Sequence, residues 1–333
     1  MTQFLKNLIY FSIVGIVLIL TLLSSYLYFD PFKVLKHYSN YSDPYVITNR
    51  DYISTSMFIN NYEKENYNSI IFGSSRTIAF KLNSWSKYLP QNDKPFMFDA
   101  SGESIYGIYT KLKYLDSENV KIKNVLIILC RDVSFKYSEN HKGHLFIKHP
   151  ATSGESYLTF QFEFFKAYAS ENFLFNFFSY KILGRYKPFM AGYIQNSKII
   201  YDTLTNQITN IDQENEITQH PIEYYTKRKE QFYERKEEKI DSVQRINQKH
   251  MFMLKEISRI LKRNNTNYKV VLSPLFEQMK FNPADLLFLK NEFGNNLYDF
   301  SGKNSFTENK INYYETSHFR PNVGDSILKL IYK

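Results

Sequence analysis

The sequence predicts an α/β protein built on a three-layer, doubly wound parallel sheet, with a helical, aromatic-rich insertion and one transmembrane helix in front. Three observations lead to this prediction. A long uncharged apolar segment lies near the N-terminus, short apolar runs alternate with segments of helical spacing, and an aromatic stretch interrupts that alternation. We expect an anchor at 1–30, a linker and first helix at 31–66, and one domain at 67–333 with its insertion at about 136–245.

The N-terminal apolar segment runs from Leu8 to Phe29 and contains no charged residue. As a helix it would be about 33 Å long, enough to cross the hydrocarbon core of a bilayer. A cleaved signal peptide is the alternative, but the run exceeds a usual signal core and no A-x-A-like site follows it. We therefore expect an uncleaved anchor. Lys6 precedes the segment while Lys33 and Lys36 follow it, so the charges do not decide the orientation.

Three short apolar runs predict the first strands of the sheet, at 69–72, 96–99 and 124–130. Each run is apolar along most of its length, as expected of a parallel strand buried on both faces. Helical spacing at 104–115 separates the second run from the third. The repeated order of strand, polar turn and helix predicts a sheet whose functional groups lie at the carboxyl ends of the strands.

The segment 136–220 breaks this order and is strongly aromatic between 157 and 180. Charged residues in the aromatic stretch, Glu163, Lys166 and Glu171, argue against a second membrane span. We expect an insertion that packs over the domain. A second interpretation is that it also rests on the membrane surface or lines an acyl-binding groove.

The C-terminal part of the chain resumes the α/β pattern. Residues 221–263 are expected to be helical over most of their length, and an apolar stripe there should pack on the sheet: Ile246, Met253, Leu254, Ile257 and Leu261. The pattern then predicts a strand at 268–274, a helix at 283–291 and a short last strand at 297–300.

Composition excludes several classes of protein. The net charge is +9, but Lys, Asn, Ile, Tyr and Phe are abundant together, which is typical of AT-rich codons and of scattered surface lysine. A basic surface that favours anionic lipids or an anionic cell-surface polymer is the alternative. No nucleic-acid-binding module is visible, so we expect no nucleic-acid partner. The single cysteine, Cys130, excludes an intramolecular disulfide and lies in an apolar run typical of a buried side chain.

A candidate nucleophile follows the first predicted strand. Gly73, Ser74, Ser75 and Arg76 form the tight turn that would expose a serine hydroxyl at a helix N-terminus. Small residues after a strand are also ordinary turn chemistry, so the turn alone does not identify a site. Arg76 would either hold a substrate carboxylate or phosphate, or pair with a neighbouring acid and fix the turn.

Candidate partners for this serine lie near the C-terminus. Glu315 and His318 are three residues apart, a spacing that lets both side chains face one nucleophile. The carboxylate would then orient the imidazole while the other ring nitrogen takes the serine proton. A second group, His141, His144 and His149, lacks an accompanying carboxylate pattern, so we interpret it as a polar loop and expect no metal site.

These residues resemble the sequence blocks of the SGNH (GDSL-like) hydrolase superfamily. The turn at 73–75 matches the first block, which is often Gly-Ser-Ser in the membrane-anchored bacterial branch, and Glu315-x-x-His318 matches the last. The segment 98–102 resembles the second block. The resemblance covers roughly residues 67–132 and 255–333, and it implies an SGNH, flavodoxin-like fold.

The resemblance also implies a mechanism and a setting. Ser75 would be the nucleophile, His318 the general base and acid, and Glu315 its orienting acid, with the backbone N–H groups of Ser75 and Gly102 binding the oxyanion. No metal or organic cofactor is implied. The chain is similar in plan to the single-span proteins of lipoteichoic-acid D-alanylation and polysaccharide O-acetylation. It would therefore be a bacterial cell-envelope esterase or O-acyltransferase with its domain outside the cytoplasm.

The sequence departs from the family pattern at two places. The third block normally supplies an Asn to the oxyanion, whereas Cys130, Arg131 and Asp132 stand there. Arg131 would either replace that donor or form a salt bridge. The acid is Glu315 where the family usually has Asp, and the alternative acids are Asp132 and Asp299.

Three functions remain open from the sequence. The first is an enzyme acting on acyl or acetyl esters of a cell-envelope polysaccharide. The second is a catalytically weak accessory protein that docks on a multi-span membrane acyltransferase and binds glycan or carrier. The third is a structural envelope protein, in which Ser75 and His318 would lie far apart.

Overall fold

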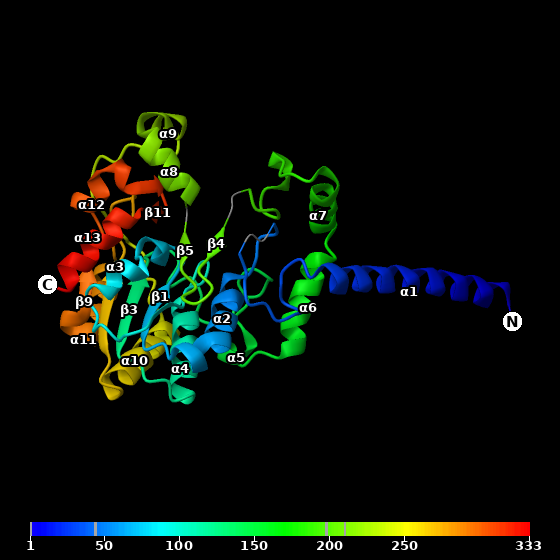
Figure 1. The fold of residues 1–333 in the computed structure, drawn as a ribbon, viewed down its shortest axis with the longest axis horizontal. Helices are drawn as coiled ribbons and strands as arrows, with labels where there is room; N and C mark the ends of the chain where they lie inside the picture. The colour runs from blue at the N-terminus through cyan, green and yellow to red at the C-terminus, as the bar shows by residue number, and fades with distance from the viewer. Residues whose placement is uncertain (1, 43–44, 197–198, 210) are drawn as a thin grey trace.

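A five-stranded parallel sheet lies at the centre of the computed structural model, which describes residues 2–42, 45–196, 199–209 and 211–333 (Figure 1). The strands in spatial order are β2 (Pro95–Met97), β1 (Ser69–Gly73), β3 (Asn124–Leu129), β7 (Asn267–Leu272) and β9 (Leu297–Asp299). This is the 2-1-3-4-5 order of a doubly wound sheet, in which the chain changes direction between β1 and β3. The mixed α/β class expected from the sequence is confirmed.

The central strands are apolar because both of their faces are covered. Every residue of β1 and β3 is buried. The two strands pair in register, from Ser69 opposite Asn124 to Gly73 opposite Ile128, so their carboxyl ends reach the same edge of the sheet. That edge is where the expected functional turns begin.

Helices pack on both faces of the sheet (Figure 1). One face is covered by α2 (Arg50–Glu65), α4 (Ile105–Ser117), α10 (Gln248–Arg263) and α11 (Pro283–Phe293), and the other by α3 (Leu82–Ser86) and α13 (Pro321–Ile331). The apolar stripe from Ile246 to Leu261 belongs to the first of these cores, as expected. The same core contains Ile53 and Phe58 of α2, so the packed domain begins well before Tyr67, where the sequence placed its start.

The expectation of helix over most of 221–263 is wrong for its middle part. Helix α9 (Pro221–Lys227) ends early, and residues 228–247 are irregular apart from β6 (Lys239–Ile240), which pairs with β8 (Met279–Lys280). The cause is tertiary: the Arg235 guanidinium donates to the carbonyl oxygens of Phe276 and Thr307 and stacks on the Phe276 ring. These contacts hold the charged run against the domain.

The insertion consists of short elements of different kinds. They are α5 (Pro150–Ser153), α6 (Tyr157–Tyr168), α7 (Glu171–Leu183), the 3-10 helix η2 (Pro188–Met190), the hairpin β4 (Ile200–Tyr201) with β5 (Ile208–Thr209), and α8 (Ile211–Gln219). The buried aromatic residues of α6 and α7 pack with the end of the N-terminal helix. The aromatic stretch therefore joins the domain to that helix.

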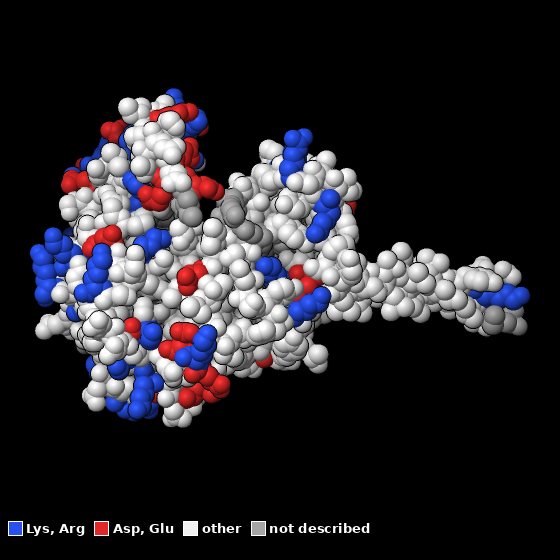
Figure 2. Space-filling model, viewed as in Figure 1, with Lys and Arg blue, Asp and Glu red and all other residues white. Residues whose placement is uncertain are grey.

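The N-terminal helix α1 (Gln3–Phe29) is long and apolar enough to span a membrane. It projects away from the domain as a single rod (Figure 1). Figure 2 shows its visible face uncharged along most of its length, with basic side chains at its far end.

The remaining short elements complete the fold. They are η1 (Ser75–Ala79), η3 (Gly294–Asn296), α12 (Ser305–Glu308), η4 (Lys310–Asn312), and the antiparallel pair β10 (Tyr313–Glu315) and β11 (His318–Phe319). The β10–β11 hairpin packs beside η1. This contact brings the two ends of the α/β domain together at one edge of the sheet.

Candidate active site

The turn after β1 positions Ser75 at the first residue of η1. Gly73 precedes it with a φ of +151°, and a Cβ there would lie 2.7 Å from the Ile128 carbonyl oxygen, so only glycine fits. Ser74 is buried, whereas Ser75 is partly exposed. The turn thus presents one serine hydroxyl at the carboxyl edge of the sheet.

The structure brings Ser75, His318 and Glu315 together. Ser75 Oγ lies 2.7 Å from His318 Nε2. The other ring nitrogen, Nδ1, is hydrogen-bonded to Glu315 Oε1 across the β10–β11 hairpin. The side chains of His318 and Glu315 are 39% and 33% exposed, so the site is open to a substrate. This is the arrangement of nucleophile, base and orienting acid found in serine hydrolases.

The Glu315 carboxylate is held ionised by its neighbours. Burial opposes ionisation, but the hydrogen bond and charge of His318 and the backbone N–H of Ser317 together lower the pKa of Glu315 below its ordinary value. The Ser317 N–H donates to Oε2 at 2.7 Å. Because each carboxylate oxygen has its own partner, the carboxylate is fixed in the orientation that the imidazole requires.

Arg76 connects three turns by hydrogen bonds: the turn after β1, the turn after β3 and the turn between β10 and β11. Its guanidinium donates to both oxygens of Asp132, at 3.1 and 2.8 Å, which links the turn after β1 to the turn after β3. Its Nε donates to the Ser317 carbonyl oxygen at 2.7 Å. Arg76 is nearly buried, at 6% exposure. The structure therefore gives Arg76 and Asp132 a positioning role between the serine and histidine loops.

Helices α8 and α9 brace the hairpin that carries His318 and Glu315. The hydroxyls of Tyr224 and Tyr225 donate to the carbonyl oxygens of Tyr314 and Tyr313, each at 2.9 Å. From α8, Glu214 accepts from the Tyr314 hydroxyl at 2.5 Å. This support could not be predicted from the sequence, because it depends on contacts between segments about 90 residues apart.

A cavity of about 190 Å³ opens beside Ser75. More of its surface is apolar than polar, and its charged lining residues are Arg50 and Asp99. The lining residues are Ile47, Thr48, Arg50, Ser75, Ile78, Asp99, Ser101, Gln195, Ile199, Tyr201 and Ile208. A space of this size beside a nucleophile is suited to a small acyl group.

Arg50 and Asp99 form a buried ion pair in the wall of this cavity. The distance from Arg50 Nη2 to Asp99 Oδ1 is 2.6 Å, and both side chains are at most 4% exposed. Arg50 also donates to the Asn206 side chain, while its Nε has no hydrogen-bond partner among the described residues. Sequence reasoning missed Arg50. A signal for its role was present in the sequence: Arg50 is a cation at the start of a helix. The helix dipole disfavours positive charge there unless an acid compensates it.

Of the two expected oxyanion donors, Ser75 lines the cavity and Gly102 does not. Gly102 adopts a left-handed conformation with a φ of +59° and lies against Phe146, whereas the preceding Ser101 lines the cavity beside Ser75. The Gly102 N–H donates no hydrogen bond to another described residue. The segment 98–102 therefore reaches the cavity through Asp99 and Ser101, and a role of Gly102 at the oxyanion stays a prediction.

Arg131 makes no hydrogen bond to Ser75, His318 or Glu315 among the described residues. Its guanidinium pairs with Asp241 at 2.5 Å and with Glu277 at 2.6 Å. Of the two expectations for Arg131, the structure shows the salt bridge. Asp299, an alternative acid, accepts from Ser301. Cys130 is buried, as expected.

The three histidines of the 136–149 loop make packing and capping contacts within the domain. His149 stacks on Tyr52 and caps α5, His144 packs on Phe32, and His141 packs against Tyr137. Burial lowers the pKa values of His144 and His149 to about 4. Within the described part of the chain, no three His, Cys, Asp or Glu side chains form a group suited to a metal ion.

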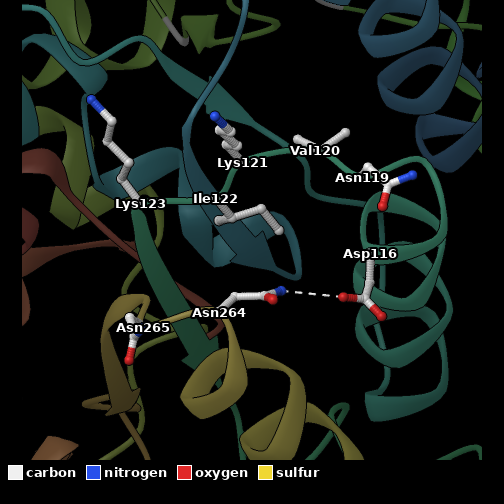
Figure 3. Close-up of a pocket in the computed structure, with 8 residues that line it drawn as sticks. All are labelled: Asp116, Asn119, Val120, Lys121, Ile122, Lys123, Asn264 and Asn265. Atoms are coloured by element: carbon white, nitrogen blue, oxygen red, sulfur yellow. Dashed lines mark hydrogen bonds between the residues drawn. The ribbon is translucent and has the colours of Figure 1, made fainter.

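A larger cavity, of about 550 Å³, lies at the opposite end of the sheet (Figure 3). It is formed where α4 and α10 end and β3 begins, and Asp116 there accepts from Asn264 at 3.2 Å. It contains no arrangement of nucleophile and base. The smaller cavity beside Ser75 is therefore the candidate site, on chemical grounds.

Comparison of the chain with protein-family models and with curated proteins finds no match. We therefore infer the function from the residues of the site.

Proposed function

We propose that this protein is a membrane-anchored serine esterase or O-acyltransferase that acts on acyl or acetyl esters of a cell-envelope glycan. The observation that carries the proposal is the chain of hydrogen bonds from Ser75 Oγ through His318 to Glu315. This chain links a nucleophile, a base and an orienting acid in the order that acyl transfer requires.

The chemistry follows from the geometry. Ser75 Oγ attacks the ester carbonyl carbon while His318 Nε2 takes the hydroxyl proton. Glu315 stabilises the imidazolium that forms, and the backbone N–H groups of Ser75 and Gly102 would bind the oxyanion. His318 then returns the proton to the leaving alcohol, which leaves an acyl group on Ser75. Water completes hydrolysis of this acyl-enzyme, whereas a sugar hydroxyl completes transfer.

The cavity beside Ser75 supports a short acyl group. Ile47, Ile78, Ile199 and Ile208 supply its apolar surface. The positive charge of Arg50 is balanced by Asp99, so this pair adds polarity but no net charge to the cavity wall. Acetyl or a short acyl chain with a polar substituent fits this combination better than a long lipid chain.

The setting is proposed from α1 and from the resemblance to the SGNH superfamily. Helix α1 would cross the membrane, with the α/β domain on the extracytoplasmic side near its polysaccharide substrate. No metal or organic cofactor takes part in the proposed reaction.

A second candidate function is an accessory protein of a multi-span membrane acyltransferase. The observation that favours it is the position of Arg131, whose salt bridges with Asp241 and Glu277 leave the oxyanion without the side-chain donor that the family pattern supplies. Such a protein would bind glycan or carrier and turn over acyl esters weakly.

Formation of the acyl-enzyme distinguishes the two. The full-length protein in detergent is mixed with p-nitrophenyl acetate, quenched in acid and analysed by peptide mass spectrometry. The enzyme proposal expects an acetyl group on the peptide that contains Ser75, and none in Ser75→Ala. An unmodified Ser75 in folded protein, with no release of p-nitrophenol above the variant, favours the accessory function.

A further inference from the structure

The outward-facing aromatic surface of α6 and α7 lies beside the end of α1. Tyr26 of α1 contacts Phe165 of α6 at 5.6 Å between ring centroids, and Phe29 contacts Phe178 of α7 at 6.0 Å. The Tyr168 hydroxyl also donates to Ser25 Oγ at 2.8 Å. The junction is therefore packed and hydrogen-bonded, and it sets where the two helices lie relative to α1.

From each of these contacts an exposed apolar stripe continues along its helix. On α6, Leu158 and Phe162 lie on the same face as Phe165, at positions i, i+4 and i+7, and they are 81% and 60% exposed. On α7, Phe175 and Ile182 share the face of Phe178 and are 63% and 83% exposed. Both stripes thus point toward the side of the domain from which α1 leaves.

The depth of the junction along α1 places these stripes at a membrane surface. Helix α1 is about 40 Å long, about 10 Å more than the hydrocarbon core it would cross. The residues that contact α6 and α7 lie between Leu22 and Phe29, in the last two turns. Helices α6 and α7 run across the axis of α1 at its base (Figure 1). They are therefore at the level where interfacial helices bury their apolar faces.

The flanking charges suit a lipid surface. Lys181, Arg185 and Lys187 gather at the end of α7 and in the turn after it, and Lys181 lies over the Phe29 ring at 5.5 Å. Basic residues beside exposed aromatic ones are typical of helices that lie in the headgroup region. Glu163 is paired with Lys166, which leaves the exposed Glu171 as the acidic residue on this surface.

We propose that the α6–α7 surface, defined by Leu158, Phe162, Phe175, Phe178 and Ile182, is embedded in the headgroup and upper acyl region of the bilayer beside α1. The proposal rests on the part of the proposed function in which α1 spans the membrane, and it is independent of the catalytic chemistry. The occupant of this surface is lipid. A two-point attachment of this kind fixes the orientation of the domain, and with it the height of Ser75 above the membrane.

Depth-dependent quenching of introduced tryptophans tests this proposal. Phe162→Trp and Phe175→Trp are made in the full-length protein and reconstituted into liposomes of phosphatidylcholine and phosphatidylglycerol, with no other protein present. Phe252→Trp is the matched control, because Phe252 is 59% exposed on α10, a helix that covers the sheet. The native Trp85 is fully buried and gives a constant background that the unsubstituted protein measures.

Lipids brominated near the headgroup end of the acyl chain should reduce the emission of Phe162→Trp and Phe175→Trp about twofold, as expected of an interfacial side chain. The emission of Phe252→Trp should not change. The proposal is overturned if both variants are insensitive to bromine and are quenched by aqueous iodide as strongly as the control, the result expected of a surface reserved for a protein partner. Flotation of the liposomes tests the membrane anchor separately from the α6–α7 surface. Protein that does not float with the liposomes overturns both proposals. Protein that floats but is not quenched overturns the α6–α7 proposal alone.

Discussion

The hydroxyl of Ser75 lies 2.7 Å from His318 Nε2, although 243 positions separate the two residues in the chain. The contact depends on two local structures far apart in the chain, the glycine turn after β1 and the β10–β11 hairpin near the C-terminus. The fold brings them to the same edge of the sheet, and Arg76 bonds to the loop between Glu315 and His318. This relationship is the basis of the following predictions.

Replacement of Glu315 by Gln should lower kcat about 10²–10⁴-fold with a small change in KM, because a neutral amide neither stabilises the imidazolium nor fixes its tautomer. The measurement is hydrolysis of p-nitrophenyl acetate by the full-length protein in detergent. Glu308→Gln is the matched control, since Glu308 is 56% exposed and lies outside the triad. Equal activity in the two variants would show that Glu315 has no part in the reaction.

Replacement of Arg76 by Lys should lower kcat about tenfold while KM stays nearly unchanged, because a lysine cannot bond to Asp132 in bidentate form and to Ser317 at once. Arg263→Lys serves as the control: Arg263 pairs with Asp116 on the surface, far from Ser75 in the fold. A rise in KM with unchanged kcat would instead assign Arg76 to substrate binding.

Replacement of Ile78 by Ala should shift selectivity toward longer acyl groups. Ile78 lines the cavity beside Ser75, and a smaller side chain makes room for additional methylene groups. The ratio of kcat/KM for p-nitrophenyl butyrate over acetate should rise about tenfold. If the ratio is the same in wild type and variant, the acyl group does not occupy this cavity.

Acid should destabilise the fold through the partly buried His149. Burial lowers the pKa of His149 to about 4, below its ordinary value of about 6.5. As the pH falls from about 6.5 toward 4, the unfolded chain binds a proton that the folded chain does not, so stability decreases over this range. At pH 5 the loss from His149 should be about 2 kcal/mol.

His149→Asn tests this prediction, because asparagine retains the capping function at α5 without titrating. Chemical unfolding in detergent at pH 7 and pH 5 should show a smaller pH-dependent loss for His149→Asn than for wild type. The exposed His37→Asn variant should behave like wild type. An identical pH dependence in all three proteins would contradict the prediction.

The parts of the fold that the sequence predicts are those with strong local signals. The apolar runs of β1 and β3, the stripe of α10 and the apolar helix α1 each depend on residues close together in the chain. Short-range pattern also predicts the turn at Ser75 and the spacing of Glu315 and His318. The candidate triad therefore follows from two local motifs, whereas its assembly requires the fold.

The features that the sequence did not predict depend on distant contacts. The helix expected through 228–247 is replaced by an irregular segment because Arg235 binds carbonyl groups of two other segments. Arg50 gains its place in the cavity wall from Asp99 and Asn206, the latter 156 residues away. Such contacts cannot be predicted from one segment, because Arg50 or Arg235 alone in the sequence resembles a solvated surface charge.

The most direct test of the central claim is labelling with a fluorophosphonate, which reacts with an activated serine hydroxyl. The full-length protein in detergent is compared with Ser75→Ala, His318→Ala and the control Ser326→Ala, a replacement on the exposed face of α13. The proposed function predicts labelling of wild type and Ser326→Ala and none in the other two. Folded wild-type protein that is not labelled, or labelling that persists in Ser75→Ala, would contradict the assignment of Ser75 as the nucleophile.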